Sequence, residues 1–328
     1  MNDSPDISVV MGVYNGADHL CETLDSILAQ EGVAFEVIVV NDGSTDQSAK
    51  ILEEYASRDA RIRVIEQENQ GLTKSLIRGC AEARGKYIAR HDVGDTSDPK
   101  KLLLQKLALD ETTDLAFVSC WTEFCGPHWE FLYLVKGTGL AGSPTCIISE
   151  TEKNGVIDGP TSHPSVIFRK DYYEKAGGYR AEFYFGQDWD LWYRLAESGK
   201  FRTIGQSLYK TRILPHSISA SEKARQIALS ALSRTALRHR QAGLSEEGVL
   251  MRARSIRPKQ PRLSRPSSES AGLYFVGECL RRNGDDRAPA YFKQSIRSSP
   301  FLVKAWIRLL QHKLAGNSRK RAALQSIV

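Results

Sequence analysis

The sequence has no long apolar run and few cysteines, and these shortages limit the kind of protein it can be. No stretch approaches the roughly 18 to 20 apolar residues that span a bilayer. The start of the chain, Met1 to Pro5, is polar and lacks the cationic and apolar parts of a secretory signal. The six cysteines are scattered without the spacing of metal ligands. We therefore expect a cytoplasmic protein with reduced thiols.

Two common nucleotide-binding motifs are also missing from the places where they would act. No Gly-x-Gly-x-x-Gly follows the first predicted strand, and no Gly-Lys-Ser/Thr phosphate loop occurs. Such glycine-rich turns let backbone amides approach a dinucleotide or a nucleoside triphosphate closely. The sequence therefore gives no support for either of these two binding modes.

Charge is unevenly distributed along the chain. Residues 222–328 contain 22 Lys and Arg and 7 Asp and Glu, a net charge of +15, whereas residues 1–221 contain 23 and 32, a net charge of −9. An acidic part suits a metal site. A basic part suits an anionic partner or surface, although it can also be a solvated helical face. We therefore expect two regions of different character.

Strand and helix patterns alternate through the first 120 residues. β-Branched and other apolar runs predict strands over 7–13, 35–40, 62–65, 87–89 and 115–120. Apolar residues at helical spacing predict helices over 17–30, around Ile51 to Tyr55, and over 72–83 and 100–109. This alternation predicts an α/β fold with a mostly parallel sheet and helices on both faces. Residues 121–160 are expected to be irregular, because glycine and proline are frequent there.

Carboxylates follow the second and fourth of these predicted strands. Asp42 follows the second, and Asp92, Asp95 and Asp98 follow the fourth. Open α/β sheets bind ligands at the edge where parallel strands have their carboxyl ends. Oxygen ligands suit Mg²⁺ or Mn²⁺, which share their coordination with substrate phosphates. The alternatives are a plain Asn-Asp-Gly turn at Asp42 and a solvated acidic loop that caps the helix after Pro99.

Four short motifs occur in order within residues 7–99. They are Val13-Tyr14-Asn15, Val39-Val40-Asn41-Asp42-Gly43-Ser44-Thr45-Asp46, Asn69-Gln70-Gly71-Leu72 and Ala89-Arg90-His91-Asp92-Val93-Gly94-Asp95. Together they resemble the nucleotide-binding half of family 2 glycosyltransferases. The resemblance implies a sheet of the glycosyltransferase A type, in which the loops matching Tyr14 and Asp42 hold the nucleoside of a nucleotide-diphosphate sugar.

The same resemblance implies a divalent-metal site in the acidic motif. Asp92 and Asp95 would hold Mg²⁺ or Mn²⁺ bound to the diphosphate, and Asp92 would also contact the donor. The usual family form resembles Asp-x-Asp-Asp, whereas this chain has Asp92-Val93-Gly94-Asp95. The third carboxylate is therefore missing, which leaves the affinity and the identity of the metal open.

A second group of motifs lies further along the chain. His163-Pro164-Ser165, Gly177-Gly178-Tyr179 and Gln187-Asp188-Trp189-Asp190 occur in the order of a His-Pro-Ser strand, a Gly-Gly-Tyr turn and a Glu-Asp-x-Asp helix start in the same family. By this resemblance, Asp188 is the catalytic base, because an acceptor hydroxyl must lose its proton as it attacks. A plain helix cap is the alternative for Asp188. Asp190 is expected to be structural. Trp189 and Trp192 could stack on sugar rings or lie in the core.

Arg212 and His216 resemble an Arg-then-His pair that contacts the diphosphate or the metal in this family. The two positions are four apart in the sequence, with Pro215 between them, which is longer than the usual interval. A surface histidine is the alternative for His216. We expect Arg212 to bind the donor and His216 to bind the metal.

The composition changes from Glu222 onward. Residues 222–242 predict a basic helix, and residues 257–268 predict a proline- and serine-rich linker. The spacing of apolar residues over 271–312 resembles one tetratricopeptide repeat with the start of a second. Because one repeat cannot bury a solenoid core alone, it must pack on another surface. A plain helical appendage and a partner-binding module are both open.

These observations predict a catalytic domain over 1–221 and a basic helical region over 222–328. The resemblance implies transfer of a sugar from a nucleotide-diphosphate donor to a hydroxyl acceptor with inversion, in surface polysaccharide or glycoconjugate synthesis. The expected acceptor is a glycan or a lipid-linked molecule. The basic region suggests contact with an anionic membrane surface at its cytoplasmic face, and no nucleic-acid partner is expected. The alternative is a non-catalytic nucleotide-sugar binder that acts through its helical repeat.

Overall fold

The computed structural model describes residues 4–137, 140–141, 156–157, 159–215, 222–258 and 266–312. The chain divides into two compact units. The first contains Met1–Glu123, Leu134–Thr211 and Ala224–Pro258, and the second contains Phe124–Tyr133, Arg212–Lys223 and Lys259–Val328. Among the described residues, none of the helices combines the length and the apolar character needed to cross a bilayer.

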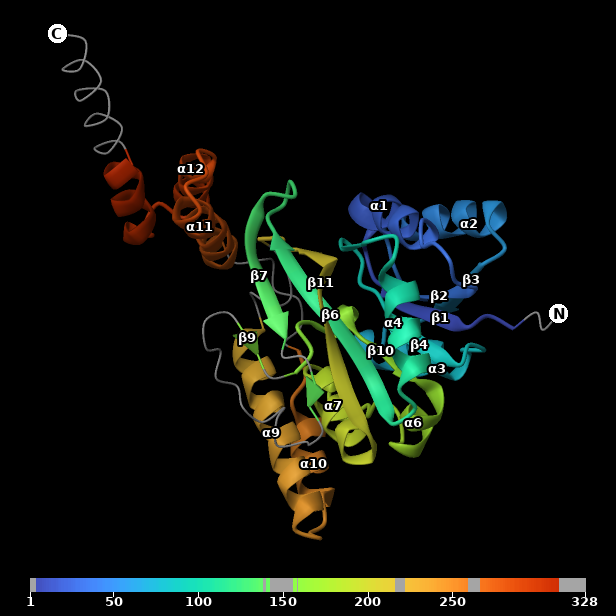
Figure 1. Ribbon diagram of the computed structural model, residues 1–328. Helices are drawn as coiled ribbons and strands as arrows, with labels where there is room; N and C mark the ends of the chain where they lie inside the picture. Colours follow the sequence, from blue (N-terminus) through green and yellow to red (C-terminus); the bar gives the residue numbers. More distant parts are fainter. Residues whose placement is uncertain are drawn as a thin grey trace. The chain divides into compact units, whose positions relative to one another are not determined.

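A large mixed sheet forms the centre of the first unit (Figure 1). Its main path runs in the order β3-β2-β1-β4-β10-β6-β11-β5. The strands are β1 (Ile7–Val13), β2 (Phe35–Asp42), β3 (Ile62–Gln67), β4 (Tyr87–Arg90), β5 (Thr96–Ser97), β6 (Leu115–Cys125), β7 (Phe131–Gly137), β8 (Leu140–Ala141), β9 (Val156–Ile157), β10 (Ile167–Arg169) and β11 (Lys200–Arg212). Strands β1 to β4 pair in parallel, as the strand–helix alternation predicts.

The expectation of a mostly parallel sheet is wrong for the later strands. Strand β10 lies antiparallel between β4 and β6, and β11 pairs antiparallel with β5 and β8. Parallel neighbours need a long crossover connection, usually a helix, whereas antiparallel neighbours can follow a short turn. A helix connects each successive pair of strands from β1 to β4, whereas β6 and β7 are separated only by residues 126–130.

Part of the segment 121–160 that we expected to be irregular is also strand. Strand β6 continues to Cys125, and β7 follows after a tight turn in which the Gly126 amide donates to the Glu130 carbonyl at 2.7 Å. Trp121, Thr122 and Phe124 favour an extended backbone. The glycine and proline at 126 and 127 therefore mark a turn between strands rather than an irregular region.

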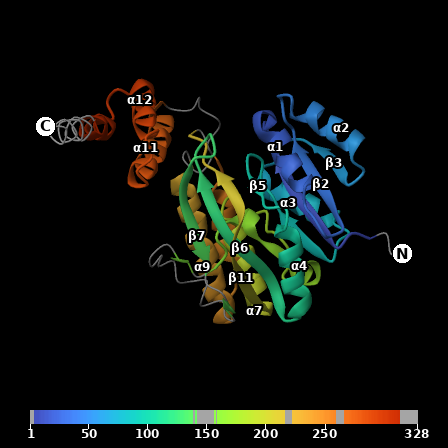
Figure 2. The same cartoon turned by 45° about the horizontal axis from the view of Figure 1, so that its top comes forward.

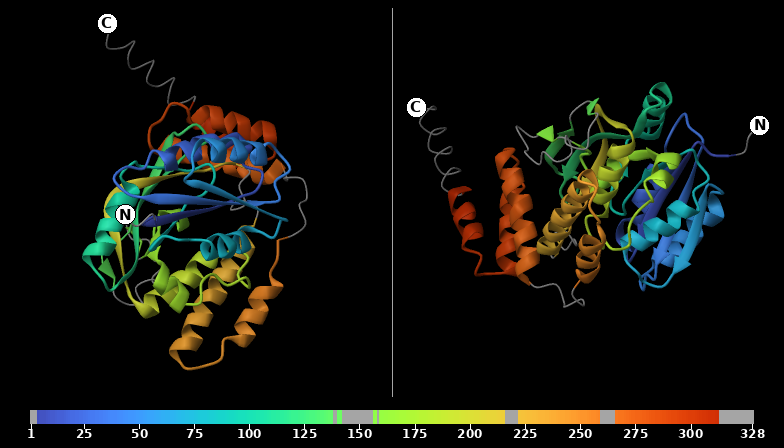
Figure 3. Two further views of the ribbon diagram at one scale, coloured as in Figure 1. Left: turned by 90° about the vertical axis from the view of Figure 1, so that its right-hand side faces the viewer. Right: turned by 90° about the horizontal axis from the view of Figure 1, so that it is seen from below.

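Helices cover both faces of the sheet, as predicted (Figures 2 and 3). The helices of the first unit are α1 (Ala17–Leu28), α2 (Ser48–Arg58), α3 (Leu72–Ala81), α4 (Lys101–Glu111), α6 (Lys170–Lys175), α7 (Gln187–Ser198), α9 (Lys223–Gln241) and α10 (Glu247–Ser255). Alternate residues of β1 point to opposite faces. Val9 and Met11 pack with α1, α2 and α4, whereas Val10 packs with α3, α6 and α7.

A buried ionic cluster holds α7 in the first unit. Asp190, which is 1% exposed, pairs with both Arg180 and Arg194, the latter at 2.7 Å. Arg180 also pairs with Glu246 at 3.0 Å, and Glu246 pairs with Arg240 of α9 at 2.7 Å. These contacts join α7 to α9 and to the start of α10. The structural role predicted for Asp190 is therefore confirmed.

A helical hairpin dominates the second unit. Helices α11 (Pro266–Arg282) and α12 (Ala288–Ser298) pack side by side through Val276, Leu280, Tyr291 and Phe292, and Leu132 from the start of β7 joins this core. A further helical stretch follows over 303–312. A hairpin is what the spacing predicts. The assignment to the tetratricopeptide class stays a prediction.

Replacement of Asp190 tests the ionic cluster. Asp190→Ala leaves the buried Arg194 without its carboxylate partner and Arg180 with Glu246 alone, so we expect a loss of about 3–5 kcal/mol in the free energy of unfolding. Urea denaturation followed by circular dichroism measures this loss. Asp171→Ala is the control, because Asp171 is exposed and 3.9 Å from Lys175, where an ion pair contributes at most about 1 kcal/mol. Equal unfolding midpoints for the two variants would contradict the structural role of Asp190.

Candidate active site

A fully buried arginine organises the end of β4. The Arg90 guanidinium donates to the carbonyls of Val10 and His91 at 3.0 and 2.8 Å, and it pairs with the Asp92 carboxylate at 2.5 Å. Burial opposes its charge, but the neighbouring Asp92 raises the pKa of Arg90 above its usual value. The guanidinium therefore remains charged and links the middle of β1, at Val10, to the acidic loop.

The two carboxylates of the acidic motif differ in exposure. The Asp92 side chain is 34% exposed although one of its oxygens pairs with Arg90. Asp95 is buried, and its Oδ2 accepts from the Thr211 hydroxyl at 3.2 Å. Both follow β4, as the sequence predicts. Asp92 is the carboxylate that a ligand can reach more easily, whereas Asp95 also anchors the end of β11.

Gly94 occupies the position where the family pattern has a carboxylate. Its φ of +93° lies in a region that favours glycine, and a Cβ there would meet no atom closer than His19 at 3.9 Å. The Gly94 amide donates to Thr23, whose hydroxyl in turn donates to the Asp95 carbonyl. The backbone conformation of this loop, rather than a lack of space, therefore favours glycine at position 94.

The loop that contains Tyr14 is held by a second loop after β2. The Asn15 side chain accepts from the Thr45 amide at 2.7 Å, and the Asn15 amide donates to the Ser44 hydroxyl at 3.0 Å. The Asp46 carboxylate accepts from the Ala17 amide at 3.0 Å. Tyr14 itself is 54% exposed. These contacts fix the backbone around Tyr14 while its ring stays open to a ligand.

Asp42 lies at the end of β2 and is buried. Its carboxylate accepts hydrogen bonds from the amides of Gln70 and Gly71 at 2.9 and 2.8 Å and from the Gln67 side chain at 2.6 Å. It therefore orders the Asn69-Gln70-Gly71 turn, a structural role that the sequence did not predict. The carboxyl ends of β2, β1 and β4 share one edge, because the three strands are parallel neighbours.

Asp188 lies in the first turn of α7 rather than at its cap. The helix begins at Gln187 and its capping position is Gly186, so the plain helix-cap alternative does not hold. One Asp188 oxygen accepts from the Trp189 amide at 2.9 Å. Loss of solvation raises the pKa of Asp188 to about 6, with Asp92 adding to the rise and Arg90 opposing it. The acidic loop and Asp188 are therefore electrostatic neighbours.

Two further motif residues connect Arg90 to the second half of the site. The Nε2 atom of His163 lies 2.7 Å from the Tyr179 hydroxyl and 3.4 Å from the Arg90 Nε–H, which can only donate. Burial, with Arg90 adding to it, lowers the pKa of His163 well below its usual value. The imidazole is therefore neutral and presents an unprotonated Nε2 to both donors. This places the His-Pro-Ser and Gly-Gly-Tyr motifs around one guanidinium.

The remaining predicted residues lie elsewhere or outside the described part of the chain. Arg212 belongs to the second unit, where its guanidinium lies 4.0 Å from the centroid of the Trp129 ring. His216 lies outside the described residues. Trp192 is buried in the core, as one of the two alternatives proposed, and Trp189 packs against it with ring centroids 5.0 Å apart.

Sequence reasoning missed two buried cations of the site. It gave no role to Arg90, although the residue sits in the acidic motif, or to Lys101, which donates to the Pro164 carbonyl at 3.1 Å. Burial lowers the pKa of Lys101 to about 8. The position of Arg90 between a predicted buried strand and a group of acids could have indicated that it is buried and paired. The sequence around Lys101 contains no such indication, because lysine is common at exposed helix starts.

The acidic motif can supply only part of a metal's coordination shell. Within the described ranges, no group of three His, Cys, Asp or Glu side chains is arranged to hold a metal ion. Mg²⁺ often takes only one or two protein carboxylates and completes its shell with water and substrate phosphates. The donor set of Asp92 and Asp95 fits a cation of this kind.

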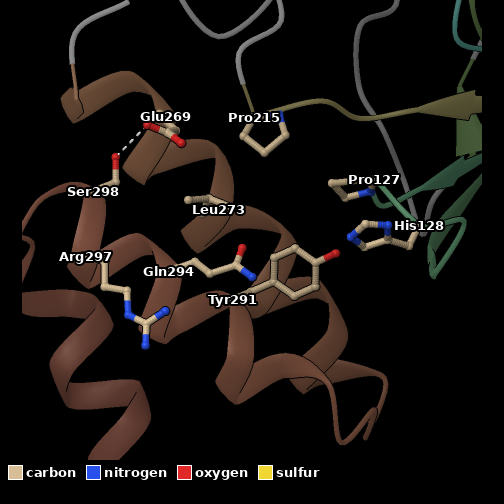
Figure 4. Close-up of a pocket in the computed structure, with 9 residues that line it drawn as sticks. All are labelled: Pro127, His128, Pro215, Glu269, Leu273, Tyr291, Gln294, Arg297 and Ser298. Atoms are coloured by element: carbon tan, nitrogen blue, oxygen red, sulfur yellow. Dashed lines mark hydrogen bonds between the residues drawn. The ribbon is translucent and has the colours of Figure 1, made fainter. Parts of the chain in front are cut away.

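A separate hollow of about 450 Å³ lies within the second unit (Figure 4). Tyr291, Gln294 and Arg297 of α12 line it together with His128. The Tyr291 hydroxyl donates to Glu130 at 2.5 Å, so this phenol is already engaged. We assign this hollow no catalytic role.

Comparison with known proteins identifies the family. Residues 8–175 match glycosyl transferase family 2. EpsE of Bacillus subtilis, which carries the name of a glycosyltransferase, is 32% identical over 222 residues, covering 65% of this chain and 74% of EpsE. Two further curated relatives, from Escherichia coli and Bacillus subtilis, match over less than half of their own length.

Solved structures share the fold. The mannosyltransferase PcManGT of Pyrobaculum calidifontis, in complex with GDP-Man and Mn²⁺, is 15% identical with a TM-score of 0.54, over 96% of this chain and 87% of that one. Residues 1–349 of TarS from S. aureus are 18% identical with a TM-score of 0.50, over 93% and 88%. This chain belongs to glycosyl transferase family 2. It is a glycosyltransferase, and no comparison supports the alternative of a non-catalytic binder.

Replacement of Asp92 tests the acidic loop. We expect Asp92→Ala to weaken donor binding by about tenfold or more and also to lower the free energy of unfolding, because the fully buried Arg90 guanidinium loses its carboxylate partner. Calorimetric titration with a nucleotide-diphosphate sugar and Mn²⁺ measures the affinity. Asp98→Ala is the matched control, since Asp98 is an exposed acid of the same segment. Unchanged affinity in folded Asp92→Ala would remove this residue from the donor site.

Proposed function

We propose that the chain transfers a sugar from a nucleotide-diphosphate donor to a hydroxyl acceptor in one displacement that inverts the anomeric centre. The observation that carries this proposal is Asp188, a carboxyl whose pKa is raised to about 6 and which neighbours Arg90 and Asp92. A carboxylate with this pKa is largely ionised at neutral pH and can still accept a proton.

The loops at the ends of β1 and β2 would hold the nucleoside. The Tyr14 ring is exposed on a backbone that Asn15 and Asp46 fix, which makes it a pre-organised surface for a base or ribose. The Asp42 carboxylate already accepts three hydrogen bonds. We propose that it contributes by ordering the turn at Gly71 and by offering its remaining lone pair to the nucleoside.

Asp92 and Asp95 would hold a divalent cation against the donor's diphosphate. When bound, such a cation neutralises charge that develops on the departing nucleoside diphosphate. The complex of PcManGT with GDP-Man and Mn²⁺ supports a donor and a cation of this class. Both Mg²⁺ and Mn²⁺ suit the carboxylate donor set. Arg212 and His216 remain proposed donor- and metal-binding residues.

Asp188 would act on the acceptor. As the acceptor oxygen forms its bond to the anomeric carbon, the bond to the diphosphate breaks and the hydroxyl proton moves to the Asp188 carboxylate. Arg90 holds Asp92 in place by an ion pair of 2.5 Å and lies close enough to affect the charge of Asp188. The same guanidinium would thus align the donor side and the base side of the site.

The acceptor is proposed to be a glycan or a lipid-linked molecule at the cytoplasmic side of the membrane. The relative EpsE carries only the general name of a glycosyltransferase. A role in surface polysaccharide or glycoconjugate synthesis therefore rests on the family resemblance and on the basic character of residues 222–328.

Asp188→Asn tests the base. The amide keeps the shape of the side chain but cannot accept the proton, so we expect kcat to fall by about 10²- to 10⁴-fold while the donor's affinity stays close to wild type. Steady-state kinetics with a glycan acceptor and calorimetry with the donor separate the two effects. Turnover near that of the wild type would rule out Asp188 as the base.

The raised pKa of Asp188 predicts a pH profile. The base must be ionised, so kcat should rise with pH through about pH 6 and then level off, with a slope of one on the acidic side. We expect this limb to disappear in the residual activity of Asp188→Asn. Rates measured from about pH 5 to pH 8 with saturating substrates decide this point. A limb that persists in the variant would assign the titration to another group.

A further inference from the structure

Four large apolar side chains form an exposed stripe on the last described helical stretch. Val303, Trp306, Ile307 and Leu310 are 64%, 47%, 47% and 57% exposed. Their spacing of i, i+3, i+4 and i+7 places them on one face of a helix. Phe301, just before this helix, is 92% exposed. We call these five residues the apolar stripe.

The opposite face of the same helix is attached to the hairpin of the second unit. Ala305 is fully buried, and Leu309 packs against the core that α11 and α12 share. Arg308 pairs with Glu278 of α11 at 3.0 Å. The helix therefore uses one face to join its own unit and leaves the apolar stripe outward.

The stretch of sequence that contains the stripe has cations and no acids. Residues 299–328 contain six Lys and Arg and no Asp or Glu. Lys304 lies exposed beside the stripe. A second copy of the chain would bring the same positive charge to the contact, which opposes pairing of two stripes. An anionic lipid surface complements the charge and also takes up apolar side chains.

We propose that the apolar stripe and the cations of residues 299–328 bind the surface of an anionic membrane. Amphipathic segments of this type lie in the plane of the interface, with their apolar face among the acyl chains and their cations near the headgroups. Tryptophan is favoured at this depth, because its ring is apolar and its N–H is polar. The stripe contains none of the residues assigned to the active site, so membrane binding and sugar transfer can be tested with separate variants.

Sedimentation of the full-length chain with lipid vesicles tests the proposal. We expect binding to vesicles of phosphatidylglycerol and phosphatidylcholine, little binding to phosphatidylcholine alone, and release at about 0.5 M salt. Ile307→Gln/Leu310→Gln should lower the partition coefficient by about tenfold or more. The matched control is Leu244→Gln/Met251→Gln, which changes two residues of the first unit that are 59% and 64% exposed and should bind like wild type.

A separate variant tests the contribution of the cations to vesicle binding. Arg319→Gln/Lys320→Gln/Arg321→Gln removes three cations, and we expect about fivefold weaker binding for each. Trp306 gives an independent readout. Its fluorescence should shift to shorter wavelength on anionic vesicles, and Trp306→Phe should lose this shift while most binding remains.

Several outcomes would overturn the proposal. Equal binding to neutral vesicles would show that charge does not contribute to binding. No binding to anionic vesicles at low salt would show that the membrane is not the partner of this surface. An equal loss in the Leu244/Met251 control would remove the role of the stripe. Self-association in lipid-free ultracentrifugation that Ile307→Gln/Leu310→Gln abolishes, without vesicle binding, would instead identify the stripe as a contact between copies.

Discussion

The burial of the Arg90 charge is the constraint on which the active site depends. A guanidinium cannot lose its proton in a protein, and a buried, unpaired charge costs several kcal/mol. The fold must therefore bring acceptors to it from several elements. It does so with carbonyls of β1 and of the acidic loop, the carboxylate of Asp92 and the ring of His163. The acidic motif and the His-Pro-Ser motif are separate in the sequence, but both supply acceptors to the Arg90 guanidinium.

This arrangement also explains how two acids with different roles share one site. Asp92 pairs directly with the guanidinium, whereas Asp188 is affected only through space and has a raised pKa. Asp190, two residues further on, has two arginines of its own and belongs to the core. Environment, rather than residue type, therefore separates a carboxylate for binding, a carboxylate for proton transfer and a carboxylate for stability.

The sequence predicted the parallel half of the sheet and the placement of its polar residues well, because strand–helix alternation is a local pattern. Asp42 is the last residue of its strand, and Asp92 and Asp95 follow theirs, close to where the sequence places them. The antiparallel position of β10 could not be predicted, since it depends on pairing between residues 167–169 and 87–89, far apart in the chain. The same holds for the three donors on Asp42 and the burial of Arg90, which arise only when distant loops meet.

The second unit is built from three separate pieces of chain, Phe124–Tyr133, Arg212–Lys223 and Lys259–Val328. Its core contains Leu132 from the start of β7 beside residues of α11 and α12. During synthesis the ribosome releases the first piece long before the last, so Leu132 has no hairpin to pack against until residues 266–298 have been made. The second unit therefore cannot be separated from the rest of the chain by a single cut. Deletion of the chain from α11 onward would leave the apolar Leu132 side chain exposed at the start of β7. The α11–α12 hairpin fused to another enzyme would in turn lack part of its own core.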